Sequence, residues 1–374
     1  MAYLYFDSAA TARPLPEAID AAGRAYTEYG NPSSLHGAGL AAKRLVDTAR
    51  AQVAAALHCK SERIVFVSSG TEANNQAIFG LAKIRGKRAK KIITTDSEHP
   101  SVAEPLKALE KEGFTVARLS TKGGVLDLKQ LERELQEPVA FLSIMRANNE
   151  TGAIYDLAGV RKLLTKYGSD AILHCDNVQG FLKIPGDRLA AVCDLITVSA
   201  HKIGGLKGTG ALYIGEKIRN LPALLPGGGQ ENGMRSGTEN VPGIAAFGAA
   251  AEKTASAGSS HTELLRDKLL AGLSDSGLIF HIPPVHLPGI LHISIPGVLS
   301  SWALNLLSAK GICVSAGSAC SAREKKKGNP VLSAYGLPAG EIETSLRISF
   351  DIWNTEEECA LLCDALRECA KLKR

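Results

Sequence analysis

A lysine and a run of glycines separate two short apolar segments at residues 195–214, which read LITVSAHKIGGLKGTGALYI. Residues 195–199 and 210–214 are almost continuously apolar or β-branched, a pattern typical of strands that are covered on both faces. Lys202 follows the first of these predicted strands and so lies at its carboxyl end, where open α/β sheets bind their ligands. A partly buried amine at such an edge has a lowered pKa, which favours covalent attachment to a carbonyl group.

Two other interpretations of residues 199–210 have to be considered. A phosphate-binding P-loop is excluded, because residues 205–210 lack the GxxxxGK[ST] spacing and lead into a predicted strand instead of a helix. A surface lysine at a turn stays open as long as Lys202 is considered alone.

Similar apolar runs alternate with amphipathic segments through the first two-thirds of the chain. We expect strands at residues 64–68, 92–95, 139–144, 171–175, 195–199 and 210–214, and helices that include 40–57, 101–112 and 157–167. This alternation predicts an α/β fold with one large, mostly parallel sheet. After about residue 258 the pattern changes to that of a smaller α+β domain, with strands at 289–295 and 346–350. We therefore expect a large domain over residues 12–255 and a small domain formed by 1–11 and 256–374.

The composition narrows the classes of protein that fit. Of 374 residues, 45% are hydrophobic and 22% are charged, which is ordinary for a globular protein and excludes a disordered chain. The net charge of +5 is not concentrated in a block of like charges, so no nucleic-acid partner is expected. No export signal or membrane-length apolar run is present, and the 8 cysteines include no CxxC pair. We expect a cytoplasmic protein with reduced thiols, no metal site and no membrane partner.

Polar side chains follow other predicted strands. Asp176 ends the strand before that of Lys202, and a buried carboxylate there needs a cationic partner such as a pyridinium nitrogen. Gln179 lies close enough in sequence to donate to a ring oxygen, and His99 follows another strand, where it can stack on a flat ring. A helix cap or an ordinary salt bridge stays open for Asp176.

The segment around Gly70 follows the first predicted strand of the sheet and opens a helix. Ser69 and Glu72 have the S-x-x-E spacing of a capping box. The exposed N–H groups at a helix start, with a glycine and a hydroxyl group, also form an anion site that suits a phosphate ester. Both interpretations stand at this point.

Taken together, these motifs resemble those of the cysteine desulfurases, which are pyridoxal-phosphate enzymes of the class-V aminotransferase group. The matching stretches are residues 30–36, 69–75, 98–100, 148–152, 199–210, 227–231, 235–238 and 318–321. They occur in order over nearly the whole chain. The resemblance implies a fold-type-I homodimer whose large domain has a mostly parallel seven-stranded sheet.

The resemblance also implies roles for single residues around the cofactor. Lys202 would hold pyridoxal 5'-phosphate covalently, His99 would stack on its ring, Asp176 would pair with the pyridine nitrogen and Gln179 would contact the phenolic oxygen. The phosphate group would be held by Gly70, Thr71, Ser199 and His201, and by Thr238 reaching across the dimer interface.

Two further residues match those that bind the substrate carboxylate in this family, namely Asn149 and Arg347. A guanidinium fork suits bidentate recognition of an α-carboxylate, although a surface ion pair is the alternative for Arg347.

Cys320 lies in a run of small residues, 315–322, which favours an exposed thiol. Most of the other cysteines lie in apolar segments, where burial raises the thiol pKa. By the resemblance, the Cys320 thiolate attacks the sulfur of the bound substrate and takes it as a persulfide, leaving alanine. An incidental loop cysteine is the alternative.

We therefore expect a desulfurase that converts L-cysteine to L-alanine and passes sulfur from Cys320 to an acceptor protein, either an iron–sulfur scaffold or a tRNA-thiolation relay. The alternatives are an aminotransferase, a selenocysteine lyase or a β-lyase on the same cofactor, and a catalytically silent scaffold for sulfur transfer. The chain departs from the family at Asn232, at residues 351–353 and in the charged stretch 323–329, which leaves the acceptor open.

Overall fold

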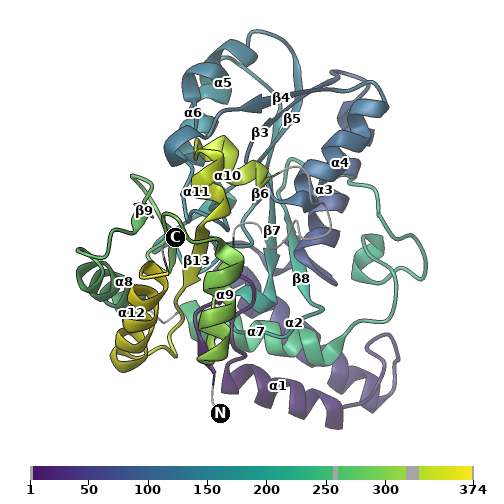
Figure 1. The fold of residues 1–374 in the computed structure, drawn as a ribbon. Coiled ribbons are helices and arrows are strands. Elements are labelled where there is room, and N and C mark those ends of the chain that lie inside the picture. Colours follow the sequence, from purple (N-terminus) through teal and green to yellow (C-terminus); the bar gives the residue numbers. More distant parts are fainter. Residues whose placement is uncertain (1–2, 256–259, 317–327, 373–374) are drawn as a thin grey trace.

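The computed structural model describes residues 3–255, 260–316 and 328–372. Its centre is a seven-stranded sheet in the order β2-β8-β7-β6-β5-β3-β4 (Figure 1). Only β8 runs antiparallel to its neighbours in this sheet. The strands are β2 (Ile64–Val67), β3 (Lys91–Thr95), β4 (Thr115–Leu119), β5 (Val139–Met145), β6 (Ile172–Asp176), β7 (Leu195–Ser199) and β8 (Gly210–Ile214). The predicted α/β class and the large, mostly parallel sheet are confirmed.

The inner strands send side chains into two separate apolar cores, one on each face of the sheet, which explains why these strands are apolar on both faces. In β2, Ile64 and Phe66 pack into the core that α1, α2, α6 and α7 cover, whereas Val65 and Val67 pack into the core of α3 and α4. The helices are α1 (Pro16–Thr27), α2 (Gly37–Ala56), α3 (Gly70–Arg85), α4 (Pro100–Lys111), α5 (Leu128–Glu134), α6 (Leu157–Lys166) and α7 (Val241–Ala255). Helices on both faces are the usual cover of a parallel sheet.

A second group of strands gathers the two ends of the chain. β12, β13, β10 and β9 form an antiparallel sheet in that order, and β1 pairs in parallel with β11. The strands are β1 (Leu4–Tyr5), β9 (Ile279–His281), β10 (Ile290–Ser294), β11 (Ile312–Cys313), β12 (Ser315–Ala316) and β13 (Ser345–Ser349). The helices here are α8 (Ser260–Gly272), α9 (Ser300–Ala309), α10 (Pro330–Tyr335), α11 (Ala339–Glu343) and α12 (Glu356–Ala370).

Phe6 ties the N-terminal segment into this second group. It is fully buried in the core of these elements and lies edge-on to Phe350, with 5.9 Å between ring centroids. The expected strands near 289–295 and 346–350 and the C-terminal helix are present. The division of the chain at residues 11/12 and 255/256 stays a prediction.

One strand of the large sheet, β4, was not predicted from the sequence. β4 lies at the edge of the sheet, where Thr115 and Arg118 are exposed and only Leu119 is fully buried. An edge strand with one neighbour needs no continuous apolar run, so the apolar pattern is too weak to reveal it. No helix in the described ranges combines the length and the apolarity needed to cross a membrane.

Candidate active site

Lys202 lies in a 3-10 turn (Ala200–Lys202) directly after β7, at the carboxyl edge of the large sheet. Its Nζ donates to the carbonyl oxygens of Ala9 at 2.6 Å and Ala10 at 2.9 Å, so the N-terminal segment crosses the site. Burial lowers the pKa of Lys202 to about 7, and the nearby cations of Lys183 and Arg347 act in the same direction. At neutral pH a large fraction of this amine is therefore unprotonated and nucleophilic.

Asp176 ends β6, the strand next to β7, and its side chain is buried. Its Oδ2 accepts from the Asn74 amide at 2.7 Å and its Oδ1 accepts from the backbone N–H of Val178 at 3.0 Å. Both of these donors are neutral. A buried carboxylate with neutral donors is stabilised further by a cation, which a protonated ring nitrogen supplies.

A chain of hydrogen bonds runs from Asp176 to His99. The Nδ2 group of Asn74 also donates to Ser101 Oγ at 2.8 Å, and Ser101 Oγ lies 2.8 Å from His99 Nδ1. Asn74 is fully buried in α3, and Ser101 is buried at the start of α4. Neither had a role in the sequence interpretation. A polar residue next to Ala73, Ala77 and Ile78 on the buried side of α3 is the signal that could have identified Asn74, although the buried Gln76 gives the same signal.

The same contacts fix the protonation of His99. The backbone N–H of Ser101 donates to His99 Nδ1 at 3.1 Å, so Nδ1 is the acceptor nitrogen and the neutral ring carries its proton on Nε2. Burial lowers the pKa of His99, and the charge of Lys202 adds to this against the opposing effect of Asp176. The ring is thus neutral and held in one orientation at the amino end of α4.

Gly70 and Thr71 open α3, and Ser199 lies beside Gly70 at the amino end of this helix. Ser69 caps this helix through a 3.2 Å bond from the Glu72 N–H, while the Glu72 carboxylate turns to Ser68 and Arg235 instead of closing the capping box. The first N–H groups of the helix, at Gly70 and Thr71, have no carbonyl partner within it.

Close packing keeps the phosphate end of the site compact. A Cβ atom on Gly70 would lie 2.7 Å from Val178 Cγ2 and 3.6 Å from Ser199 Cβ, so only glycine fits there. His201 lies 3.3 Å from Thr11 Oγ1 through its Nδ1, and burial together with Lys202 lowers its pKa to about 4.

Arg347 enters from β13, in the second group of strands, and its side chain is buried. Its Nη2 donates to Asp7 at 3.0 Å and its Nη1 donates to the Asn149 carbonyl at 2.9 Å. Its Nε is buried without a hydrogen-bond partner in the described residues. Asn149 is half-buried and turns its own amide to Glu150. The structure thus brings Arg347 and Asn149 together, and the Nε–H of the guanidinium is left for an anionic ligand.

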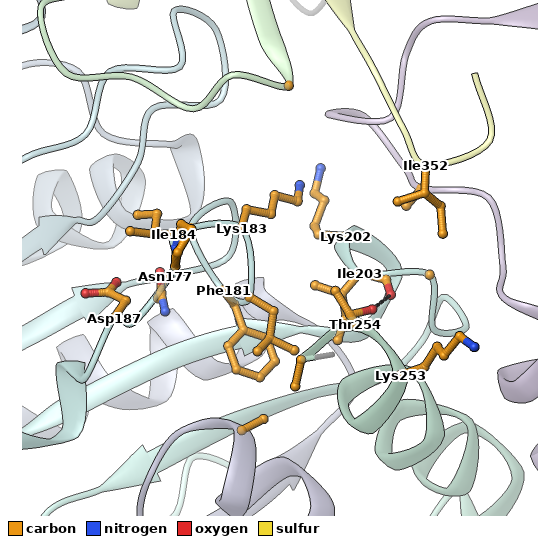
Figure 2. A pocket seen from close by; sticks show the side chains of 18 of the residues that line it. Asn177, Phe181, Lys183, Ile184, Asp187, Lys202, Ile203, Lys253, Thr254 and Ile352 are labelled. Atoms are coloured by element: carbon orange, nitrogen blue, oxygen red, sulfur yellow. Dashed lines mark hydrogen bonds between the residues drawn. The ribbon is translucent and has the colours of Figure 1, made fainter. Parts of the chain in front are cut away.

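A cavity of about 860 Å³ opens beside Lys202, between the large sheet's loops and the β13–α12 connection (Figure 2). Lys183, Phe181 and Ile352 also line it. A separate, shallower hollow of about 460 Å³ is lined by Thr71 and His99, among others. Thr238 does not line this hollow and is exposed on the loop between β8 and α7.

These features fit pyridoxal phosphate. The buried Asp176 with neutral donors suits a ring nitrogen, the start of α3 suits the phosphate, and the Lys202 amine suits the aldehyde. The charges of Asp176 and Arg347 act on Lys202, and the charges of Asp176 and Lys202 act on His99. The groups expected at one site therefore lie at one edge of the sheet.

Cys320 lies outside the described residues. The seven described cysteines are all free, and burial raises the pKa of Cys59, Cys359 and Cys369 to about 11. Burial also raises the pKa of Cys175 and Cys313. Thiols with such pKa values are poor nucleophiles at neutral pH.

Comparison with known proteins gives a consistent result. The family model for class-V aminotransferases matches residues 4–362. A cysteine desulfurase of Trichormus azollae is 39% identical over 100% of this chain and 94% of its own. Among solved structures, a NifS-like protein has a TM-score of 0.91 and 35% identity, with 99% of each chain covered. A structure titled SspA in complex with cysteine has a TM-score of 0.81 and 28% identity, covering 94% of this chain and 99% of the other.

Proposed function

The chain belongs to the class-V aminotransferase family and, within it, to the pyridoxal-phosphate-dependent cysteine desulfurases, and on this premise we propose how its own residues carry out the reaction. The proposed site consists of Lys202, His99 and Cys320 as catalytic residues, with Asn149 and Arg347 holding the substrate. Gly70, Thr71, Asp176, Gln179, Ser199, His201 and Thr238 complete the cofactor site.

Arg347 selects the substrate by its carboxylate. The guanidinium is buried and is oriented by Asp7 and the Asn149 carbonyl, so little conformational entropy is lost when a carboxylate binds. Because Asp7 already balances part of its charge, a bound α-carboxylate competes with Asp7 for the same fork. Free amino acids, and not longer peptides with a blocked carboxylate, are the ligands that this arrangement favours.

Lys202 and His99 handle protons near the substrate. When bound, pyridoxal phosphate supplies an electron-withdrawing ring that takes up the electron pair of the broken Cα–H bond. The pKa of Lys202 near 7 allows its amine to take and return a proton at neutral pH. His99, with its proton on Nε2 and its Nδ1 held by the backbone N–H of Ser101, keeps a fixed, uncharged ring over the site.

Cys320 receives the sulfur. Its thiolate attacks the sulfur of bound L-cysteine, a new S–S bond forms and the Cβ–S bond of the substrate breaks. The electron pair of that bond stays on the substrate carbon, which takes up a proton and becomes the methyl group of L-alanine. The products are alanine and a Cys320 persulfide, so no external oxidant or reductant is needed.

A homodimer and a protein acceptor complete the proposal. Thr238 is exposed on its loop, and α1 with the segment after it exposes Tyr26, Tyr29 and Leu35 by 72%, 89% and 92%. Apolar surface of this kind supports association with a second copy, which would bring its Thr238 to the phosphate. The acceptor would be an iron–sulfur scaffold or a tRNA-thiolation relay, and a cytoplasmic location stays a prediction.

The observation that carries this proposal is the Lys202 amine of depressed pKa beside the buried Asp176 carboxylate, whose donors are neutral. The test is to mix the loaded enzyme with L-cysteine and measure both alanine and the mass of the Cys320 peptide. We expect one added sulfur on Cys320 and a loss of alanine formation by more than a hundredfold in Cys320→Ser. Borohydride reduction should fix the cofactor to the Lys202 peptide.

The matched control is Cys313→Ser, because Cys313 is half-buried and its pKa is raised. This variant should keep its turnover. If Cys320→Ser forms alanine at the original rate, the enzyme is a β-lyase that does not use this thiol, and the persulfide step is wrong.

A further inference from the structure

Lys183 lies near the site but has no role in the scheme above. It follows β6 on the loop that contains Gln179 and lines the same cavity as Lys202, and Figure 2 shows both side chains extending toward the same side of that cavity. Its Nζ donates to Gln179 Oε1 at 3.2 Å.

We propose that Lys183 is a positioning residue: it orients the Gln179 amide toward the cofactor and holds a second positive charge beside the Lys202 amine. The inference rests on the proposed roles of Lys202 and Gln179.

The first effect follows from donors and acceptors. A lysine ammonium group only donates, so the oxygen of the Gln179 amide must face Lys183 and the nitrogen must face the other way. Gln179 Nε2 donates to the Ala9 carbonyl at 2.7 Å, which is the carbonyl that Lys202 Nζ also contacts. The second N–H of the amide would then be left to donate to the phenolic oxygen of the cofactor. Without Lys183 the bond to the Ala9 carbonyl alone holds the amide in this orientation, and its oxygen loses its partner.

The second effect is electrostatic. The charged groups that face Lys202 are Lys183 from the loop after β6, Arg347 from β13, Asp7 from the N-terminal segment, Asp176 from β6 and Glu150 from the loop after β5. The nearby His99 and His201 are neutral. Those that face Lys183 are Asp351 and Arg347. In the described residues no carboxylate lies within ion-pair distance of either amine. Two adjacent, unpaired ammonium groups repel each other, so the amine that gives up its proton more easily becomes the nucleophile.

The pKa values agree with a charged Lys183 beside a nucleophilic Lys202. Burial lowers the pKa of Lys183 to about 8 and that of Lys202 to about 7. Near pH 7 Lys183 therefore keeps its charge while Lys202 is close to half neutral. The residue before Lys183, Leu182, has a φ of 59°, which L side chains rarely adopt, so the backbone of this loop is strained.

The test measures the Lys202 amine in the full-length chain freed of cofactor. Brief pulses of acetic anhydride from pH 5.5 to 10, followed by mass spectrometry of the Lys202 peptide, give the midpoint at which this amine becomes reactive. We expect a midpoint near 7 in the parent protein and in Lys183→Arg, and a midpoint about one pH unit higher in Lys183→Met. At pH 7 that shift corresponds to about fivefold less neutral amine. Lys183→Gln provides a second uncharged variant if Lys183→Met does not fold.

The Gln179 effect is measured by the affinity for pyridoxal phosphate in Lys183→Met, Gln179→Ala and the double variant. We expect the two losses to be far from additive, because both remove the same oriented amide. An unmoved midpoint for Lys202 in both uncharged variants, or additive losses of affinity, overturns the inference. Borohydride mapping separates this outcome from a failure of the proposed function, since an adduct on a residue other than Lys202 refutes the cofactor site whatever Lys183 does.

Discussion

Asn74 is the residue whose removal should reveal most about the site, because it joins the two halves of the hydrogen-bond chain. The change to alanine removes the bond to Ser101 Oγ at 2.8 Å and the bond to Asp176 Oδ2 at 2.7 Å. A neutral bond contributes about 0.5–1.5 kcal/mol and one to a charged group about 1.5–3 kcal/mol. Asn74→Ala should therefore lower the free energy of unfolding by about 2–4 kcal/mol.

The assay is urea unfolding of the cofactor-free chain, with the affinity for pyridoxal phosphate as a second readout. Asp176 retains one donor, the Val178 N–H, so its carboxylate becomes less well oriented and the affinity should fall as well. The loss of stability should be smaller in the loaded enzyme, because the ring nitrogen then stabilises the carboxylate that Asn74 no longer holds.

Asn75 is the matched control. It is a half-buried asparagine on the same helix that borders the hollow of Thr71 and His99, and its amide donates to the Thr71 carbonyl four residues earlier. Asn75→Ala should change the free energy of unfolding by about 0.5 kcal/mol or less. If Asn74→Ala were no more destabilising than Asn75→Ala and bound the cofactor equally well, the Asp176–Asn74–Ser101 chain would have no role in the site.

Three further predictions concern stability. Leu182→Gly should raise the free energy of unfolding measured in urea by up to about 1 kcal/mol, since glycine adopts the φ of 59° without strain; a loss would mean that the packing of the leucine outweighs the strain. Glu231→Gln should cost about 3–5 kcal/mol in the same measurement, because Glu231 is buried and pairs with both terminal nitrogens of Arg50, at 2.6 and 2.7 Å; a cost below 1 kcal/mol contradicts this. Burial raises the pKa of Glu98 to about 8, so the folded chain keeps a proton that the unfolded chain releases above about pH 4.3. The contribution of Glu98 to the free energy of unfolding is therefore complete below that pH and declines by up to about 1.4 kcal/mol per pH unit as the pH rises toward 8. In Glu98→Gln the urea midpoint of unfolding should vary less with pH over this range. If it varies with pH as much as in the parent protein, the assignment to Glu98 is wrong.

Residues that end continuous apolar strands were accessible to sequence reasoning. Asp176 and Lys202 each follow a strand whose residues are all buried, and the carboxyl ends of neighbouring parallel strands meet at one edge. Position along the chain therefore translates directly into position in the site. The same logic identified His99 and the start of α3 at Gly70, because each lies at a junction between a strand and a helix.

Residues that reach the site through tertiary packing were not accessible in this way. Asn74 and Asp176 are 102 positions apart, and only the packing of α3 on the sheet makes them neighbours. Lys183 was not identified from the sequence for a different reason: a lysine on a loop usually lies at the surface. Its importance depends on the burial that lowers its pKa and on a bond to Gln179, neither of which leaves a pattern in the sequence.

Arg347 shows how far the substrate end of the site depends on the ends of the chain. Asp7 accepts from Arg347 at 3.0 Å and from Ser315 Oγ at 2.8 Å, so one carboxylate joins the N-terminal segment to β13 and to β12. Ser315 lies only five positions before Cys320 in the sequence. A substrate carboxylate that competes for Arg347 weakens its bond to Asp7, and Asp7 is then held mainly by Ser315. Binding of the substrate is thus connected by two hydrogen bonds to β12, which precedes Cys320, the proposed sulfur acceptor, in the sequence.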